Sequence, residues 1–101
     1  MPKVVIRPEA ESDLIQTFRW YEERIPGLGQ VFLISVDAVI QSIRRAPESY
    51  PIVHQSIRRA VIRRFPFGIF YVAKPQRVVV LAIFHTRRNP KRWQQRGKKK
   101  M

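Results

Sequence analysis

The segment from His85 to Trp93 holds the residues best suited to chemistry. It reads His-Thr-Arg-Arg-Asn-Pro-Lys-Arg-Trp, so it places an imidazole and an indole beside four cationic side chains. Such groups can bind phosphates, stack on a base or transfer protons during cleavage of an RNA backbone. They also fit a structural role, because a tryptophan often covers a core and a lone histidine often ends a strand. The spacing alone leaves both interpretations open.

A second basic cluster consists of Arg58, Arg59, Arg63 and Arg64. In one extended strand over residues 57–65, alternation would send Arg59 and Arg63 to one face of the sheet and the other two arginines to the opposite face. At most two or three of them could therefore line one site. The same pattern is typical of an edge strand protected by charge.

Several familiar kinds of active site are excluded by residues that the chain lacks. It has no cysteine, which rules out disulfides, thiolate zinc sites, iron–sulfur clusters and a thiol nucleophile. Its two histidines, His54 and His85, show no metal-binding spacing. No glycine-rich phosphate loop follows a strand, and no serine lies in a nucleophile elbow. We therefore expect neither a metal nor a cofactor.

Charge is distributed unevenly along the chain, which carries +13 overall. Residues 1–50 hold six bases and all seven acids, whereas residues 51–101 hold fourteen bases and no acid. So steep an asymmetry favours a polyanionic partner, either nucleic acid or an acidic protein segment.

The length of 101 residues suffices for one core. We expect a single domain over residues 1–96 and a disordered basic tail over residues 97–101. No apolar run is long enough for a signal-peptide core or a membrane span, so we expect a cytoplasmic protein that does not associate with a membrane.

The expected order of elements is β-α-α-β-β-β followed by a short helix, an α+β fold. Patterns of period 3.6 begin at Pro8 and after the turn at 26–29, and they predict two antiparallel helices. The strand over 77–85 lacks polar alternation, so we expect it to be buried on both faces, with the first strand beside it. The helical hairpin should pack on one face of a small, mainly antiparallel sheet. Strands are predicted over residues 3–7, 57–65, 67–73 and 77–85, and a last helix after Asn89-Pro90 carries Trp93.

Apolar residues outside the main helical stripes pose a separate question. Trp20 lies off the stripe of the first helix, and a second apolar flank on the second helix consists of Val31, Leu33, Ile34 and Ala38. Burial within the monomer is the default expectation for these side chains. A surface that binds a partner is the alternative.

Four local signatures are specific in combination. They are Ala-Glu-Ser-Asp-Leu at 10–14, Tyr-Glu at 21–22 with Pro-Gly-Leu-Gly at 26–29 leading to Phe32, Ile-Arg-Arg at 57–59 with Arg-Arg-Phe-Pro-Phe at 63–67 and Ile-Phe-Tyr at 69–71, and His-Thr-Arg-Arg-Asn-Pro at 85–90 with Trp93. With these signatures the chain resembles the ParE/RelE superfamily of bacterial toxin–antitoxin toxins. The resemblance implies the fold of that superfamily and a toxin role that can serve plasmid stabilization.

One branch of this superfamily consists of ribosome-dependent messenger-RNA endonucleases that use no metal. Resemblance to that branch implies Glu48 as base, His85 as acid and Arg87 as electrostatic helper. These nucleases place an arginine just before the aliphatic-aromatic-tyrosine run, and this chain has Gly68 there. Because a glycine side chain can neither contact phosphate nor stabilise transition-state charge, the nuclease set is incomplete at that position.

The Pro-Gly-Leu-Gly turn and the His-x-Arg-Arg-x-Pro-x-x-Trp ending are more similar to the ParE branch. That resemblance implies a non-enzymatic inhibitor of DNA gyrase that acts by protein–protein contact. It also implies a small, acidic, ParD-like antitoxin as partner, with operator DNA bound only through the antitoxin. A RelE-type endoribonuclease, with ribosome and messenger RNA as partners, is the first alternative, and a non-toxic nucleic-acid-binding module is the second.

The residues that would carry these contacts fall into two groups. A disordered acidic segment could fold onto the surplus apolar flank of the helical hairpin. Candidates for antitoxin binding are Trp20, Val31 and Ile34. Candidates for target binding are Arg59, Arg63, Arg87, Arg88 and Trp93.

Overall fold

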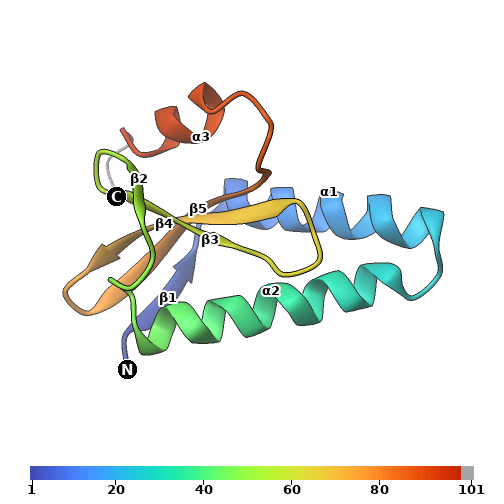
Figure 1. Cartoon of the computed structure of the whole chain (residues 1–101), viewed down its shortest axis with the longest axis horizontal. Coiled ribbons are helices and arrows are strands. Elements are labelled where there is room, and N and C mark those ends of the chain that lie inside the picture. The colour runs from blue at the N-terminus through green and yellow to red at the C-terminus, as the bar shows by residue number, and fades with distance from the viewer. Residues whose placement is uncertain (99–101) are drawn as a thin grey trace.

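The structure is a computed structural model that describes residues 1–98. Its fold is a mixed five-stranded sheet between a helical hairpin and a short third helix (Figure 1). Its elements are β1 (Lys3–Ile6), α1 (Pro8–Arg24), α2 (Leu28–Arg45), β2 (Ile52–His54), β3 (Ile57–Val61), β4 (Phe67–Lys74), β5 (Arg77–His85) and α3 (Lys91–Arg96). The predicted α+β class, the hairpin, the antiparallel meander and the last helix are confirmed.

The sheet has the strand order β1-β5-β4-β3-β2. β1 runs parallel to β5, with Lys3 opposite Arg77 and Ile6 opposite Val80, and the other neighbours are antiparallel. The first strand therefore lies beside the apolar strand, as predicted. It is an edge strand of the sheet and is only half-buried.

Two cores occupy the two faces of the sheet. The face toward α1 and α2 buries Val78 and Val80 with the apolar stripe of α2, and the face toward α3 buries Val79 and Leu81 with Trp93. Alternate residues of β5 thus enter different cores. Burial of β5 on both faces is confirmed, and it explains the absence of polar residues between its two ends.

The hairpin turn depends on local chemistry at the start of α2. The Glu22 carboxylate accepts hydrogen bonds from the backbone N–H groups of Gly27 (2.8 Å) and Gly29 (3.0 Å). These are free donors at a helix N-terminus, where negative charge is favourable. Gly27 has φ +91°, which suits glycine. Gly29 lies so close to Phe18 that a Cβ atom there would be 2.7 Å from its carbonyl oxygen, so this glycine sets the spacing of the two helices.

The predicted strand over residues 57–65 is too long. β3 ends at Val61, and the chain then turns, with Arg64 at φ +70° and the Ile62 N–H bonded to the Phe67 carbonyl at 2.9 Å. Arg63 and Arg64 belong to this turn, so the face assignment based on strand alternation is wrong for them. The short edge strand β2 had no predicted counterpart.

The surplus apolar side chains are not buried in the monomer, contrary to the default expectation. Trp20 is 51% exposed, Val31 45% and Ile34 69%. Ile25, which follows the last residue of α1, is 59% exposed.

The end of the chain continues past α3. Gly97 and Lys98 form a turn, and a Cβ atom on Gly97 would lie 2.6 Å from Ile57 Cδ1. Residues 99–101 of the predicted tail lie outside the described residues. Within residues 1–98, no helix is both long enough and apolar enough to cross a membrane.

Candidate functional site

The site residues are positioned by the open end of β5, beyond the point where β1 stops. Arg7 N–H still bonds the Val80 carbonyl at 3.1 Å, and past this residue β5 has no strand on that side. Asp13 from α1 accepts the Ile83 N–H at 3.0 Å, and Arg96 from α3 donates to the Leu81 carbonyl at 3.0 Å. Two helices thereby satisfy the backbone groups that a further strand would otherwise pair.

A register shift between β4 and β5 lies at the same place. Phe70 pairs with Ala82 and Tyr71 pairs with Val80, so Leu81 is the extra residue of a bulge. Leu81 and Ala82 consequently both face the α3 core. A bulge bends its strand and increases the local twist, and this one lies just before the segment that carries the basic cluster.

A cleft of about 380 Å³ lies between α1 and this end of the sheet. It brings together three residues singled out from sequence for different roles, namely Trp20, His85 and Arg88. The face of the Trp20 indole is covered by Arg24, whose Cζ lies 3.6 Å from the ring centroid. The lining residues are Asp13, Gln16, Thr17, Trp20, Tyr21, Pro66, Phe67, Ile83, Phe84, His85 and Arg88.

The residues proposed for nuclease chemistry are not assembled into one site. His85 is half-buried, lies 5.4 Å from Phe67 between ring centroids, and accepts the Arg87 N–H at Nδ1 (3.1 Å). Glu48 is exposed beside Lys74, at the opposite end of β4. The length of an eight-residue strand, roughly 20 Å, separates it from His85. A base and an acid so far apart cannot act on one scissile phosphate.

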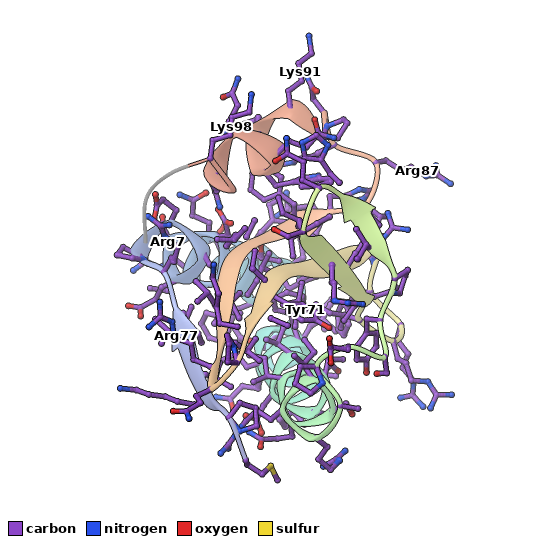
Figure 2. All side chains as sticks on the ribbon, turned by 90° about the vertical axis from the view of Figure 1, so that its left-hand side faces the viewer. Arg7, Tyr71, Arg77, Arg87, Lys91 and Lys98 are labelled. Atoms are coloured by element: carbon purple, nitrogen blue, oxygen red, sulfur yellow. The ribbon has the colours of Figure 1, made fainter. Side chains whose placement is uncertain are left out.

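The exposed arginines of both predicted basic clusters meet at the His85 end of the sheet. Thr86 donates its backbone N–H (2.8 Å) and its hydroxyl (3.3 Å) to the Pro66 carbonyl, which ties the β3–β4 turn to the loop after β5. Arg63 lies in that turn, and Arg87 and Arg88 lie in that loop, all three exposed. Figure 2 shows Arg87 extending away from the body of the protein.

Two other target-binding candidates have less access to a partner. The Trp93 indole stacks on Phe70 (centroid distance 4.3 Å, interplanar angle 22°) and is 6% exposed, so it closes the α3 core. Arg59 is half-buried, and its stem covers Gly68, where a Cβ atom would lie 3.0 Å from Arg59 Cγ.

Three arginines surround one buried ring, and two of them were not singled out from sequence. The Cζ atoms of Arg88, Arg92 and Arg96 lie 5.8, 5.5 and 4.8 Å from the centroid of Phe84. The regular four-residue spacing of these arginines in the sequence was the signal that could have grouped them.

The antitoxin-binding candidates do not share one groove. On α1, Phe18 and Glu22 face the start of α2, because they contact Gly29 and Gly27 there. Trp20 is two residues from each of them, and two residues along a helix correspond to a rotation of 200°. Trp20 therefore points away from α2, into the cleft. By the same rotation from Gly29, Val31 points away from α1. The two apolar surfaces lie on opposite sides of the hairpin.

Tyrosine side chains in the hairpin core serve structure. The Tyr71 hydroxyl donates to the Pro47 carbonyl at 2.6 Å, and burial raises the pKa of Tyr71 to about 12. Burial also raises the pKa of Tyr21, which lies against Phe32 and Phe65. Within residues 1–98, no three histidine or carboxylate side chains gather in a way that could hold a metal ion.

Known proteins resemble this chain in both sequence and fold. Toxin ParE2 of Mycobacterium tuberculosis, from strains CDC 1551 and H37Rv alike, is 27% identical over 81 residues, which cover 79% of this chain and 77% of that protein. A solved structure described as the chromosomal ParDE TA system from P. aeruginosa has the same fold, with a TM-score of 0.75 at 17% identity over 84% of this chain and 96% of that chain. The family model for the ParE toxin of the type II toxin–antitoxin system parDE matches residues 4–90. Because that match spans most of its length, the chain belongs to the ParE family of type II toxin–antitoxin toxins.

Proposed function

We propose that this toxin inhibits DNA gyrase by protein–protein contact and that a small acidic antitoxin of the ParD type neutralises it. Membership of the ParE family supports gyrase inhibition as the function, since resemblance to that branch implies a gyrase inhibitor. The observation that carries the proposal is that Glu48 and His85 lie at opposite ends of β4, together with a glycine at position 68. Within residues 1–98, the chain thus offers a basic surface for contact, and Glu48 and His85 are not assembled as an acid–base pair.

The target surface in this proposal is the His85 end of the sheet. Arg63, Arg87 and Arg88 are exposed there, and no carboxylate occurs after residue 50 to neutralise them locally. Unpaired guanidinium groups favour an acidic protein surface and speed its association. Trp93 acts in this proposal as the support of the surface, because its ring stacks on Phe70 inside the core.

The antitoxin is proposed to bind the two exposed apolar surfaces of the helical hairpin. Since Trp20 and Val31 point to opposite sides of that hairpin, one rigid helix cannot cover both. A segment that is disordered when free can pass around the helices and fold as it binds. Its acidic side chains would complement a chain of +13.

The test is supercoiling by purified DNA gyrase with increasing amounts of the folded toxin, with and without the antitoxin. Inhibition with accumulation of cleaved DNA, reversed by the antitoxin, is the expected result. The double variant Arg63→Gln/Arg87→Gln should weaken inhibition at least tenfold. Lys74→Gln/Arg77→Gln removes the same charge from the opposite end of the sheet and is the matched control.

Absence of any effect on gyrase at a large molar excess of folded toxin would contradict the proposal. Cleavage of messenger RNA on programmed ribosomes is the measurement for the alternative function. Cleavage there would assign the toxin to the endoribonucleases.

A further inference from the structure

The α3 segment, defined here as Arg87, Arg88, Lys91, Arg92 and Arg96, concentrates positive charge beyond what its packing requires. Arg96 alone has a carboxylate partner, Asp13, at 2.6 Å. The other four side chains are exposed, and no ion pair joins them to any acid within residues 1–98. Figure 2 shows Arg87 and Lys91 extending away from the protein.

Arg88 and Arg92 are held near each other by a common neighbour. Both Cζ atoms lie within 6 Å of the Phe84 centroid, at 5.8 and 5.5 Å, so the two guanidinium groups can be no further apart than the sum of these distances. Contact with the ring favours each cation weakly. Arg88 precedes α3 and Arg92 lies in its first turn, and two like charges held this close repel each other. A polyanion that bound between them would relieve this repulsion.

The chemistry of the α3 segment favours a phosphodiester backbone over an acidic peptide. Large exposed apolar side chains occur elsewhere in residues 1–98, at Ile34 and Trp20 for example, but none lies between Thr86 and Lys98. Peptides that fold on binding need apolar anchors. Guanidinium, ammonium and amide groups are the groups that contact nucleic-acid phosphates.

The closed packing of Trp93 favours duplex over single-stranded nucleic acid. Unpaired bases bind proteins largely by stacking on exposed aromatic rings. The one indole in this region already stacks on Phe70 and is 6% exposed, and Phe84 is 3% exposed beneath the arginines. The surface therefore offers contacts to a phosphate backbone and no exposed ring on which an unpaired base could stack.

We propose that the α3 segment binds the phosphate backbone of duplex DNA directly and independently of base sequence. The choice of DNA over duplex RNA rests on the proposed function, because the target enzyme works on duplex DNA. This contact differs from operator recognition, which the family resemblance assigns to the antitoxin. It would allow the toxin to bind protein and DNA together at an enzyme that holds both.

The experiment is fluorescence anisotropy of a labelled short DNA duplex, titrated with antitoxin-free toxin at several salt concentrations. Each phosphate contact contributes about 0.9 to the slope of log K against log salt concentration. Arg88→Gln/Arg92→Gln should therefore lower the magnitude of the slope by about 2 and weaken binding at every salt concentration. Lys74→Gln/Arg77→Gln changes the net charge equally at a distant turn and should leave the slope unchanged. In Figure 2, Arg77 lies well away from Arg87 and Lys91.

Three outcomes would overturn the inference. One is equal loss in both double variants, which would mean attraction to the overall charge only. Another is the absence of duplex binding at low salt, and the third is tighter binding of duplex RNA or single strands than of duplex DNA. Circular dichroism verifies that each variant is folded. Gyrase inhibition without DNA binding would reject this inference alone, whereas DNA binding without gyrase inhibition would reject only the proposed function.

Discussion

Asp13 of α1 and Arg96 of α3 form a two-point ion pair, with N–O distances of 2.6 and 3.3 Å, although 83 residues separate them in the chain. The two side chains are 13% and 16% exposed. The same carboxylate accepts the Ile83 N–H, and the same guanidinium donates to the Leu81 carbonyl. The pair therefore fastens both helices to the open edge of β5, next to the bulge and the cleft.

Replacing Asp13 by alanine should destabilise the protein by about 2–4 kcal/mol. The substitution leaves the Arg96 guanidinium and the Ile83 N–H without their partner in a mostly buried place. Urea unfolding measures the change in free energy. Glu23→Ala removes an exposed acid from the same helix and should change stability by less than about 0.5 kcal/mol. Equal stability of the two variants would show that the ion pair does not hold α3.

Gly29→Ala should destabilise the protein by about 1–3 kcal/mol. The new methyl group would lie 2.7 Å from the Phe18 carbonyl and 2.8 Å from its ring, so the two helices must move apart. Gln30→Ala, at an exposed position of the same turn, is the control in urea unfolding. Unchanged stability of Gly29→Ala would mean that the hairpin adapts its spacing freely.

Elements that depend on local pattern could be predicted from the sequence. Three such patterns identified elements correctly. Pro8 indicated the start of α1, the apolar stripe indicated α2, and the uninterrupted apolar run from Val78 to Phe84 indicated β5. β2 could not be predicted, because three residues carry too little periodicity and their pairing with β3 is irregular. The end of β3 was not predicted, because the turn after it has Arg64 at a positive φ, and arginine gives no sequence signal for that conformation.

The site depended on contacts that no local pattern encodes. Asp13 was interpreted as an acid that favours the start of α1, whereas its carboxylate reaches β5 and α3. Trp20 and Val31 were grouped by hydrophobicity, but their sides of the hairpin follow from which residues contact the partner helix. Glu48 and His85 were paired by the family resemblance, and only the folded structure places them at opposite ends of β4.

Stability should fall above pH 10 because of Tyr71. The unfolded chain releases the tyrosine proton near pH 10, whereas burial keeps the folded pKa at about 12. Between these values deprotonation favours the unfolded state, so the free energy of unfolding falls as pH rises, by up to roughly 2–3 kcal/mol. Tyr71→Phe should lose about 1 kcal/mol at pH 8, with its hydrogen bond to the Pro47 carbonyl, yet decline less above pH 10. Urea midpoints at pH 8 and pH 11 compare the two proteins, and parallel declines would assign the effect to other groups.

Trp20→Ala should weaken antitoxin binding by more than about 1 kcal/mol without unfolding the toxin. The indole is half-exposed and forms a wall of the cleft, so its loss removes contact area for the partner and little of the core. Isothermal calorimetry measures the affinity. Ile25→Ala, which removes an apolar side chain exposed outside the cleft, is the control. Affinity equal to that of the unmodified toxin would remove Trp20 from the antitoxin interface.

His85→Ala and Glu48→Ala should each leave growth inhibition largely intact when the toxin is expressed without its antitoxin. General acid and base groups typically contribute a hundredfold or more to a nuclease, so a catalytic role would make either variant nearly harmless. With the two side chains at opposite ends of β4, no shared catalytic step links them, and a contact inhibitor needs neither proton transfer. Arg63→Gln/Arg87→Gln should reduce growth inhibition, since it alters the proposed contact surface. Loss of toxicity in both single variants, with loss of messenger cleavage on ribosomes, would establish the nuclease instead.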